Sequence, residues 1–127
     1  MVNGFDRLVE AARSVVAPRQ LSESAMCGTV GAAVETAEGE VFVGVCVDMA
    51  SSVGFCAEHS AAAAMLTAGG SAITRMVAIG QSGAVLAPCG RCREFVAQLD
   101  PANGHTLVMV DNTTVVSLSE LLPYRWT

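Results

Sequence analysis

Valines alternate at every second position from Val41 to Val47, so segment 40–48 carries its apolar side chains on one face. This period of two is typical of a β-strand with one buried face. The segment follows the apolar stretch 28–37 across the turn sequence AEGE. Two such strands joined by a short turn predict an antiparallel hairpin, so the rest of the fold has to be built around a sheet.

The other segments alternate between helical and strand-like patterns. The first helix has apolar residues at helical spacing, with Asn3 as a candidate N-cap. We predict helices over 3–16, 56–68 and 89–99, a half-helix at 118–123, and strands over 73–80, 105–111 and 113–118. This order predicts a single domain over residues 1–127, with a three-layer α-β-α architecture and a mixed sheet of about five strands.

Composition restricts the classes of ligand and partner. The formal net charge is −5, all seven basic residues are arginines, and the absence of lysine excludes a P-loop. An acidic chain without basic runs does not favour nucleic acid. No apolar run approaches the roughly 20 residues of a membrane helix, and we see no export signal. We therefore expect a cytoplasmic protein that binds a small uncharged or cationic molecule and neither membranes nor nucleic acid.

Five cysteines, two of them in a C-x-x-C pattern, indicate metal or redox chemistry rather than a disulfide framework. Cys56, Cys89 and Cys92 each stand at the start of a predicted helix, where the helix dipole favours the thiolate that binds zinc. Three protein ligands leave a fourth position for water, as in catalytic zinc sites. We therefore expect one Zn²⁺ per chain.

Glu58 lies two residues after Cys56, on the same helical turn but turned aside, so it can face a zinc-bound water without binding the metal. Zinc-bound hydroxide beside a proton-shuttling glutamate is suited to hydrolytic deamination of an aminated heterocycle, with release of ammonia. Three thiolates and one zinc ion sum to a charge of −1. Arg91 is a candidate to offset this charge by donating a hydrogen bond to a sulfur.

These two motifs, CAE at 56–58 and PCGRC at 88–92, resemble the cytidine deaminase family, and the resemblance covers nearly the whole chain. It implies the cytidine deaminase fold, one catalytic zinc per chain and a homotetramer in which a neighbouring subunit completes the site. It also implies that backbone groups near Ala57 and Ala87 contact the pyrimidine.

The substrate-reading positions differ from the pattern of the nucleoside-specific members. Cys46-Val47-Asp48 stands where the family has Asn-x-Glu to bind the ribose, and Gly28 replaces a base-stacking phenylalanine. The ending SELLPYRW is more similar to blasticidin-S deaminases, which implies that Trp126 and Tyr124 lie near the substrate mouth. Cytidine, deoxycytidine, blasticidin S and other aminated heterocycles all remain candidate substrates.

Two other functions fit parts of the pattern. A thiol–disulfide oxidoreductase would use Cys89 and Cys92 but leave Cys56 and Glu58 without a role. A structural zinc module would need a fourth fixed ligand. Among the remaining candidate ligands, Cys27 and Cys46 are typical of small core residues, and His59 and His105 of solvated, interface or structural histidines.

Overall fold

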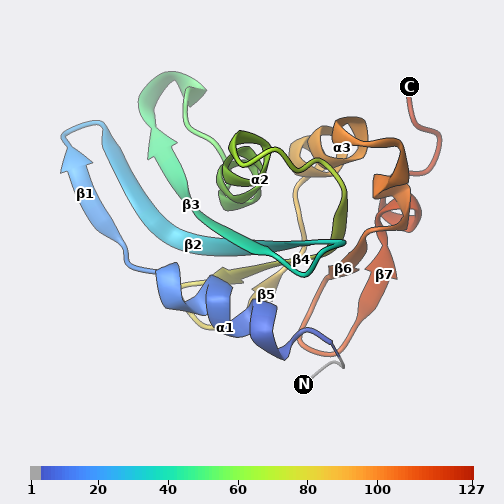
Figure 1. The fold of residues 1–127 in the computed structure, drawn as a ribbon. Coiled ribbons are helices and arrows are strands. Elements are labelled where there is room, and N and C mark those ends of the chain that lie inside the picture. Colours follow the sequence, from blue (N-terminus) through green and yellow to red (C-terminus); the bar gives the residue numbers. More distant parts are fainter. Residues whose placement is uncertain (1–3) are drawn as a thin grey trace.

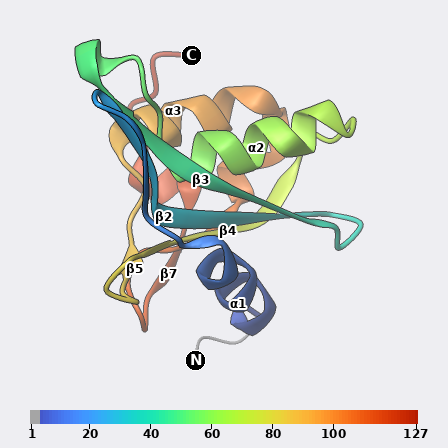
Figure 2. The ribbon, with the colours of Figure 1, turned by 90° about the vertical axis from the view of Figure 1, so that its left-hand side faces the viewer.

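A computed structural model describes residues 4–127, and its strands form one seven-stranded sheet. Figures 1 and 2 show α1 against one face of this sheet and α2 and α3 against the other. The elements in chain order are α1 (Asp6–Val15), β1 (Arg19–Ser22), β2 (Ala25–Thr36), β3 (Val41–Met49), η1 (Ala50–Ser52), α2 (Ala57–Thr67), β4 (Ile73–Gly80), β5 (Val85–Leu86), α3 (Gly90–Leu99), η2 (Pro101–His105), β6 (Leu107–Met109), β7 (Val115–Ser117) and η3 (Leu118–Leu121). The predicted three-layer α-β-α architecture is confirmed.

The sheet is mixed and is organised around the long strand β2. Strands β3 and β4 both pair with β2 in antiparallel register, which confirms the predicted hairpin. Strand β6 then pairs with β4 in parallel and with β7 in antiparallel register. The structure adds two strands to the expected five. β1 is exposed throughout and β5 has only two residues, so neither shows the alternation that marks a strand in sequence.

The first helix starts later than expected. Phe5 occupies the N-cap position without a side-chain cap hydrogen bond, whereas Asn3, the candidate N-cap, lies outside the described residues. The buried side chains Leu8, Val9 and Ala12 place one face of α1 on the sheet. Within residues 4–127, no helix is both long enough and apolar enough to span a bilayer.

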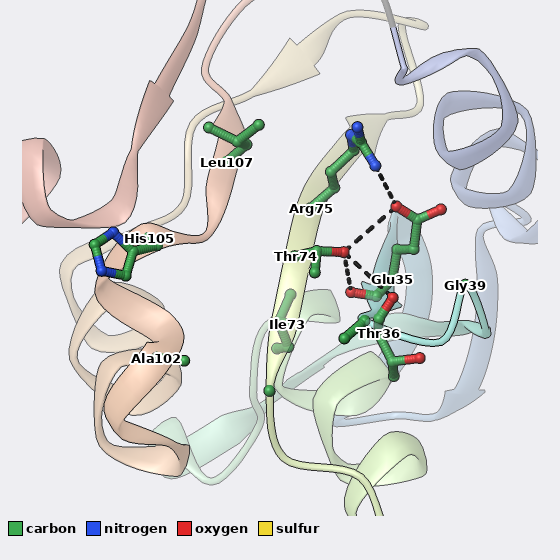
Figure 3. A pocket seen from close by; sticks show the side chains of 11 residues that line it. Glu35, Thr36, Gly39, Ile73, Thr74, Arg75, Ala102, His105 and Leu107 are labelled. Atoms are coloured by element: carbon green, nitrogen blue, oxygen red, sulfur yellow. Dashed lines mark hydrogen bonds and ion pairs between the residues drawn. The ribbon is translucent and has the colours of Figure 1, made fainter.

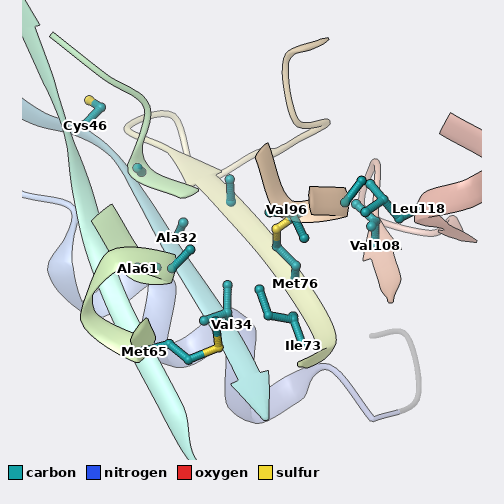
Figure 4. Packing of buried hydrophobic residues seen from close by; sticks show 14 residues of the cluster. Ala32, Val34, Cys46, Ala61, Met65, Ile73, Met76, Val96, Val108 and Leu118 are labelled. Carbon is teal, nitrogen blue, oxygen red and sulfur yellow. The ribbon is translucent and has the colours of Figure 1, made fainter. Parts of the chain in front are cut away.

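The sheet separates two apolar clusters, and β2 contributes to both. Ala33 faces the cluster beneath α1, whereas its neighbours Ala32 and Val34 face the cluster beneath α2 and α3. Figure 4 shows this second cluster, in which Met65 of α2 lies near Val34 of β2, and Met76 of β4 lies near Val96 of α3. Because both faces of the central strands are covered, the sheet provides a rigid support for the starts of α2 and α3.

Small residues bring α2 very close to β3. A methyl group at Gly44 would collide with the backbone nitrogen of Ala61 and with Ser60. On the helix side, Ala57, Ala61 and Ala62 are completely buried. Part of the alanine run of α2 therefore serves close packing on the hairpin, and this packing fixes where the first turn of α2 lies.

Candidate active site

Two helices begin beside each other and bring the three predicted ligands together. Cys56 is the N-cap of α2, Cys89 is the N-cap of α3, and Cys92 lies in the first turn of α3. Their three Sγ atoms all lie within 4.8 Å of one another, and the Sγ atoms of Cys56 and Cys89 are 3.5 Å apart. Residues 33 positions apart in sequence thus converge at one point, as the sequence predicted.

The three sulfurs have different surroundings. Cys89 is exposed. Partial burial opposes its ionisation, but hydrogen bonds from the backbone N–H of Cys92, from the thiols of Cys56 and Cys92, and from the backbone N–H of Arg91 bring its pKa below the usual value. Burial raises the pKa of Cys56. Burial also raises the pKa of the fully buried Cys92, and the nearby charge of Glu58 raises it further. The prediction that each helix start favours a thiolate therefore holds for Cys89 alone, because burial outweighs the effect at Cys56 and Cys92, and these two thiols need a cation beside them to ionise.

This geometry fits zinc. Tetrahedral coordination with Zn–S bonds of about 2.3 Å places sulfurs roughly 3.8 Å apart, which is within the spread of these three sulfurs. In the part of the chain that the structure describes, no fourth histidine, cysteine or carboxylate joins this group. A set of three ligands is the arrangement of a catalytic zinc site, whereas a structural site would be closed by a fourth.

Glu58 lies beside this cluster and is only 6% exposed. It occupies the first turn of α2, and burial raises the pKa of its carboxyl group. The side chain also lines a cavity of about 230 Å³ that Cys56 and Cys89 border. A carboxyl group in this setting can hold a proton and release it to a molecule bound in the cavity.

The walls of this cavity come from β2, β3 and the segment before α3. It is lined by Thr29, Val30, Cys46, Asp48, Phe55, Cys56, Ala57, Glu58, Ala78, Leu86, Ala87 and Cys89. Cys46, Asp48, Ala57 and Ala87, which we predicted to contact the substrate, all line this cavity. Cys46 is also a core residue, as expected of a small thiol, and its Sγ lies 3.1 Å from Thr29 Oγ1.

The resemblance also singled out Trp126, Tyr124 and Gly28, and none of these three lines the cavity. Trp126 is 92% exposed and Tyr124 is fully exposed, and neither lines the cavity. Gly28 has a φ of +85°, and a side chain there would collide with the backbone carbonyl of Ala17. An aromatic residue at this position would therefore require a different path of the chain between α1 and β1.

A larger cavity of about 550 Å³ lies elsewhere, along the start of β4 (Figure 3). Its main ionisable groups are already paired, because Glu35 Oε1 lies 2.7 Å from Arg75 Nη1 and Glu35 Oε2 lies 3.7 Å from Arg7 Nη1. None of its lining residues belongs to the metal-ligand group found in residues 4–127. The smaller cavity beside the cysteines is therefore the candidate active site.

Sequence analysis missed the contact that His59 makes with a predicted zinc ligand. Its Nδ1 lies 3.2 Å from Cys92 Sγ, and its ring stacks on Phe95 with centroids 4.2 Å apart. Burial lowers the pKa of His59, and the charge of Arg91 lowers it further. Arg91 itself is exposed, and the structure records no hydrogen bond from its side chain to a sulfur within residues 4–127.

Comparison with known proteins gives a consistent set of relatives. No family model matches the chain. The cytidine deaminase of Mycobacterium tuberculosis (strain ATCC 25618 / H37Rv) is 31% identical over 96 residues, which are 74% of this chain and 69% of that protein. The cytidine deaminase of Mycobacterium tuberculosis (strain CDC 1551 / Oshkosh) matches with the same identity and coverage.

Solved structures extend the similarity to nearly the full chain. The crystal structure of cytidine deaminase from Mycobacterium tuberculosis matches with a TM-score of 0.81 and 27% identity, over 98% of both chains. The cytidine deaminase from Burkholderia pseudomallei matches with a TM-score of 0.76 and 30% identity, over 99% of this chain and 100% of that one. The predicted fold is confirmed by these matches.

Proposed function

The chain belongs to the cytidine deaminase family and is a zinc-dependent deaminase, and from this premise we propose that it hydrolyses the amine of a cytosine nucleoside or a closely related aminated heterocycle. The observation that carries the proposal is the convergence of three sulfurs within 4.8 Å beside a buried carboxyl group and a cavity. Cys56, Cys89 and Cys92 would hold the zinc. Bound zinc supplies a water nucleophile at neutral pH by lowering the pKa of water to about 7.

Glu58 would move the protons. It accepts one from the attacking water as the new C–O bond forms and delivers it to the adjacent ring nitrogen. It then accepts the second water proton and passes it to the amine, so that the C–N bond breaks and ammonia leaves. The balance is one water consumed, a carbonyl formed and one ammonia released, with no redox change. Burial raises the pKa of Glu58, which is the direction that suits a group that both takes and gives protons.

The cavity walls would position the ring and its substituent. Ala57 and Ala87 line the cavity together with Cys56 and Cys89, so their backbone groups would contact the ring, and Cys46 and Asp48 on β3 would contact its sugar or other substituent. Asp48 is exposed, neither ion pair of the described residues involves it, and its Oδ2 accepts a long hydrogen bond from Cys46 Sγ at 3.9 Å, so its carboxylate would still be able to bind hydroxyl or cationic groups. Arg91 would contribute positive charge near the metal rather than a direct contact.

Glu58→Gln tests the proton-transfer role, because glutamine keeps the size and polarity of the side chain but cannot carry a proton. We expect a loss of ammonia release of at least about 100-fold with unchanged zinc content and fold. Glu10→Gln, an exposed glutamate on α1 at the opposite face of the sheet, is the matched control. Turnover at the wild-type rate in Glu58→Gln would refute the role.

Metal analysis tests whether the chain holds zinc, and a panel of substrates tests which molecule it deaminates. A deaminase should contain about one zinc per chain, whereas a thiol–disulfide oxidoreductase should lack zinc and form a reversible disulfide. Cytidine, deoxycytidine, cytosine and blasticidin S, followed by ultraviolet absorbance, would identify the substrate. A zinc-loaded chain that released ammonia from none of these or other aminated heterocycles would contradict the proposed function.

We also propose a cytoplasmic homo-oligomer, specifically a homotetramer that completes each site with a neighbour's residues. Large apolar side chains are exposed in three places: Phe55 and Leu86 at the cavity, Met49 and Val53 between the end of β3 and α2, and Tyr124 and Trp126 in the tail. Association would cover such residues and bring the exposed tail to a cavity. Light scattering that gave the mass of one chain at assay concentrations would contradict this.

A further inference from the structure

His59 joins the two helices that carry the zinc ligands. It lies in the first turn of α2, next to Glu58, and its Nδ1 is 3.2 Å from the Sγ of Cys92 in the first turn of α3. The ring is also stacked on Phe95 of α3 at an interplanar angle of 24°. Since Phe95 lies three residues after Cys92, both groups present the same face of α3 to the imidazole. The ring is therefore held both at its nitrogen and on its face.

The direction of this hydrogen bond follows from the chemistry of a metal ligand. A cysteine that binds zinc is a thiolate, and a thiolate can only accept a hydrogen bond. Nδ1 of His59 must then carry the proton. It does so in the neutral Nδ1–H tautomer and in the imidazolium ion alike, so the bond does not depend on the charge of the ring.

Among the three sulfurs, that of Cys92 most needs a donor. Cys92 is completely buried, whereas Cys89 is exposed and Cys56 is partly exposed, so water can reach the other two ligands more easily. Glu58, next to His59 in the first turn of α2, is buried as well, so a second acidic group lies beside the cluster. A buried anion beside a second anion is stabilised strongly by a directed N–H donor.

We propose that His59 is a positioning residue of the metal centre, which donates Nδ1–H to Cys92 Sγ and thereby both orients this ligand and withdraws charge from it. The inference rests on the proposed zinc site but concerns a residue outside the ligand set. Three thiolates exceed the charge of one zinc ion by one unit. A hydrogen bond to one sulfur reduces the electron density that this sulfur donates, which leaves the metal more electrophilic. His59 would therefore supply the correction that the sequence had suggested for Arg91.

Two variants separate the donor from the ring. His59→Phe keeps an aromatic ring against Phe95 but has no donor, whereas His59→Asn loses the ring but keeps an N–H close to the position of Nδ1. In full-length protein, we expect His59→Phe to lower zinc affinity about 10- to 100-fold in a chelator competition, and His59→Asn to stay closer to wild type. His105→Leu, at the chain's other histidine, is the matched control and should leave zinc affinity unchanged.

Replacing zinc with cobalt gives a spectroscopic measurement that distinguishes loss of the hydrogen bond from loss of packing. The sulfur-to-cobalt charge-transfer band reports how readily the thiolates give up an electron. Without the hydrogen bond, Cys92 becomes a stronger electron donor, so we expect this band to move to longer wavelength in His59→Phe and to remain near wild type in His59→Asn. Neither measurement requires turnover.

Unchanged zinc affinity and an unmoved cobalt band in His59→Phe would overturn the inference while leaving the proposed function intact. A wild-type chain that bound neither metal would overturn both. If His59→Phe failed to fold, His59→Asn would decide, because a tenfold loss of zinc affinity despite its N–H would contradict the role of the donor.

Discussion

Asn103 allows a quantitative test of how α3, the helix at whose start Cys89 and Cys92 lie, is held in place. Its side chain is completely buried and forms three hydrogen bonds. Nδ2 donates to Val96 O at 2.9 Å and to Ser71 O at 3.1 Å, while Oδ1 accepts from Ile73 N at 2.8 Å. Val96 O is among the last four carbonyls of α3, which lack partners within the helix. Asn103 therefore ties the end of α3 to the start of β4.

Asn103→Ala would leave these three backbone groups without their partner. An orphaned buried group costs about 1–3 kcal/mol, and two of the three bonds are fully buried. We therefore expect the free energy of unfolding to fall by about 3–5 kcal/mol. With an unfolding entropy of about 2.1 cal/mol/K per residue over 127 residues, this corresponds to a Tm roughly 11–19 °C lower. Asn103→Asp should be at least as damaging, because it turns two donations into repulsion.

The assay is urea and thermal unfolding, followed by circular dichroism with zinc held in constant excess, since bound metal shifts apparent stability. Asn112→Ala is the matched control, because Asn112 is exposed and accepts one hydrogen bond, from Val85 N at 3.1 Å. This control should lose less than about 1 kcal/mol. If Asn103→Ala lost no more than Asn112→Ala, the assignment of α3's anchoring to Asn103 would be refuted.

Two further predictions concern stability: one tests the close packing at Gly44, and the other tests the contribution of bound zinc. Gly44→Ala should lower the free energy of unfolding by at least about 1–3 kcal/mol, because the new methyl collides with the backbone of Ala61. Urea unfolding would measure this loss, with Gly90→Ala as the control, since nothing lies within 4 Å of a methyl there. Zinc removal by a chelator should lower Tm, and free zinc at 100 times its dissociation constant should restore about 2.7 kcal/mol. A Tm that did not respond to zinc would contradict a metal site formed only in the folded chain.

Local pattern was sufficient to predict most elements. The strand at 73–80 has the bounds of β4, and the helices predicted over 56–68 and 89–99 differ from α2 and α3 by one residue at most at either end. The periodicity or composition of each of these segments favours one type of secondary structure, helix or strand, without help from the rest of the chain. β1 and β5 were missed because β1 is exposed throughout and β5 has only two residues, so neither carries a strand pattern, although each pairs with a strand close to it in sequence.

The sequence by itself determined the chemistry that the site can perform. The interpretation of Cys56, Glu58, Cys89 and Cys92 used only local facts, namely that cysteine thiolates bind zinc and that a glutamate two residues from a ligand can face the open position. Residue identities thus predicted both the metal and its ligands before any contact was known, with a thiol–disulfide oxidoreductase and a structural zinc module as the alternatives.

Tertiary structure alone decided what surrounds those ligands. It placed His59 against Cys92, left Arg91 exposed without such a bond, and tied the end of α3 to β4 through Asn103. These contacts arise where two helices pack against one sheet, and a shift of a single residue in that packing would exchange the partners. No local sequence pattern encodes such a choice, because its free energy comes from the burial and hydrogen bonding of groups distant along the chain.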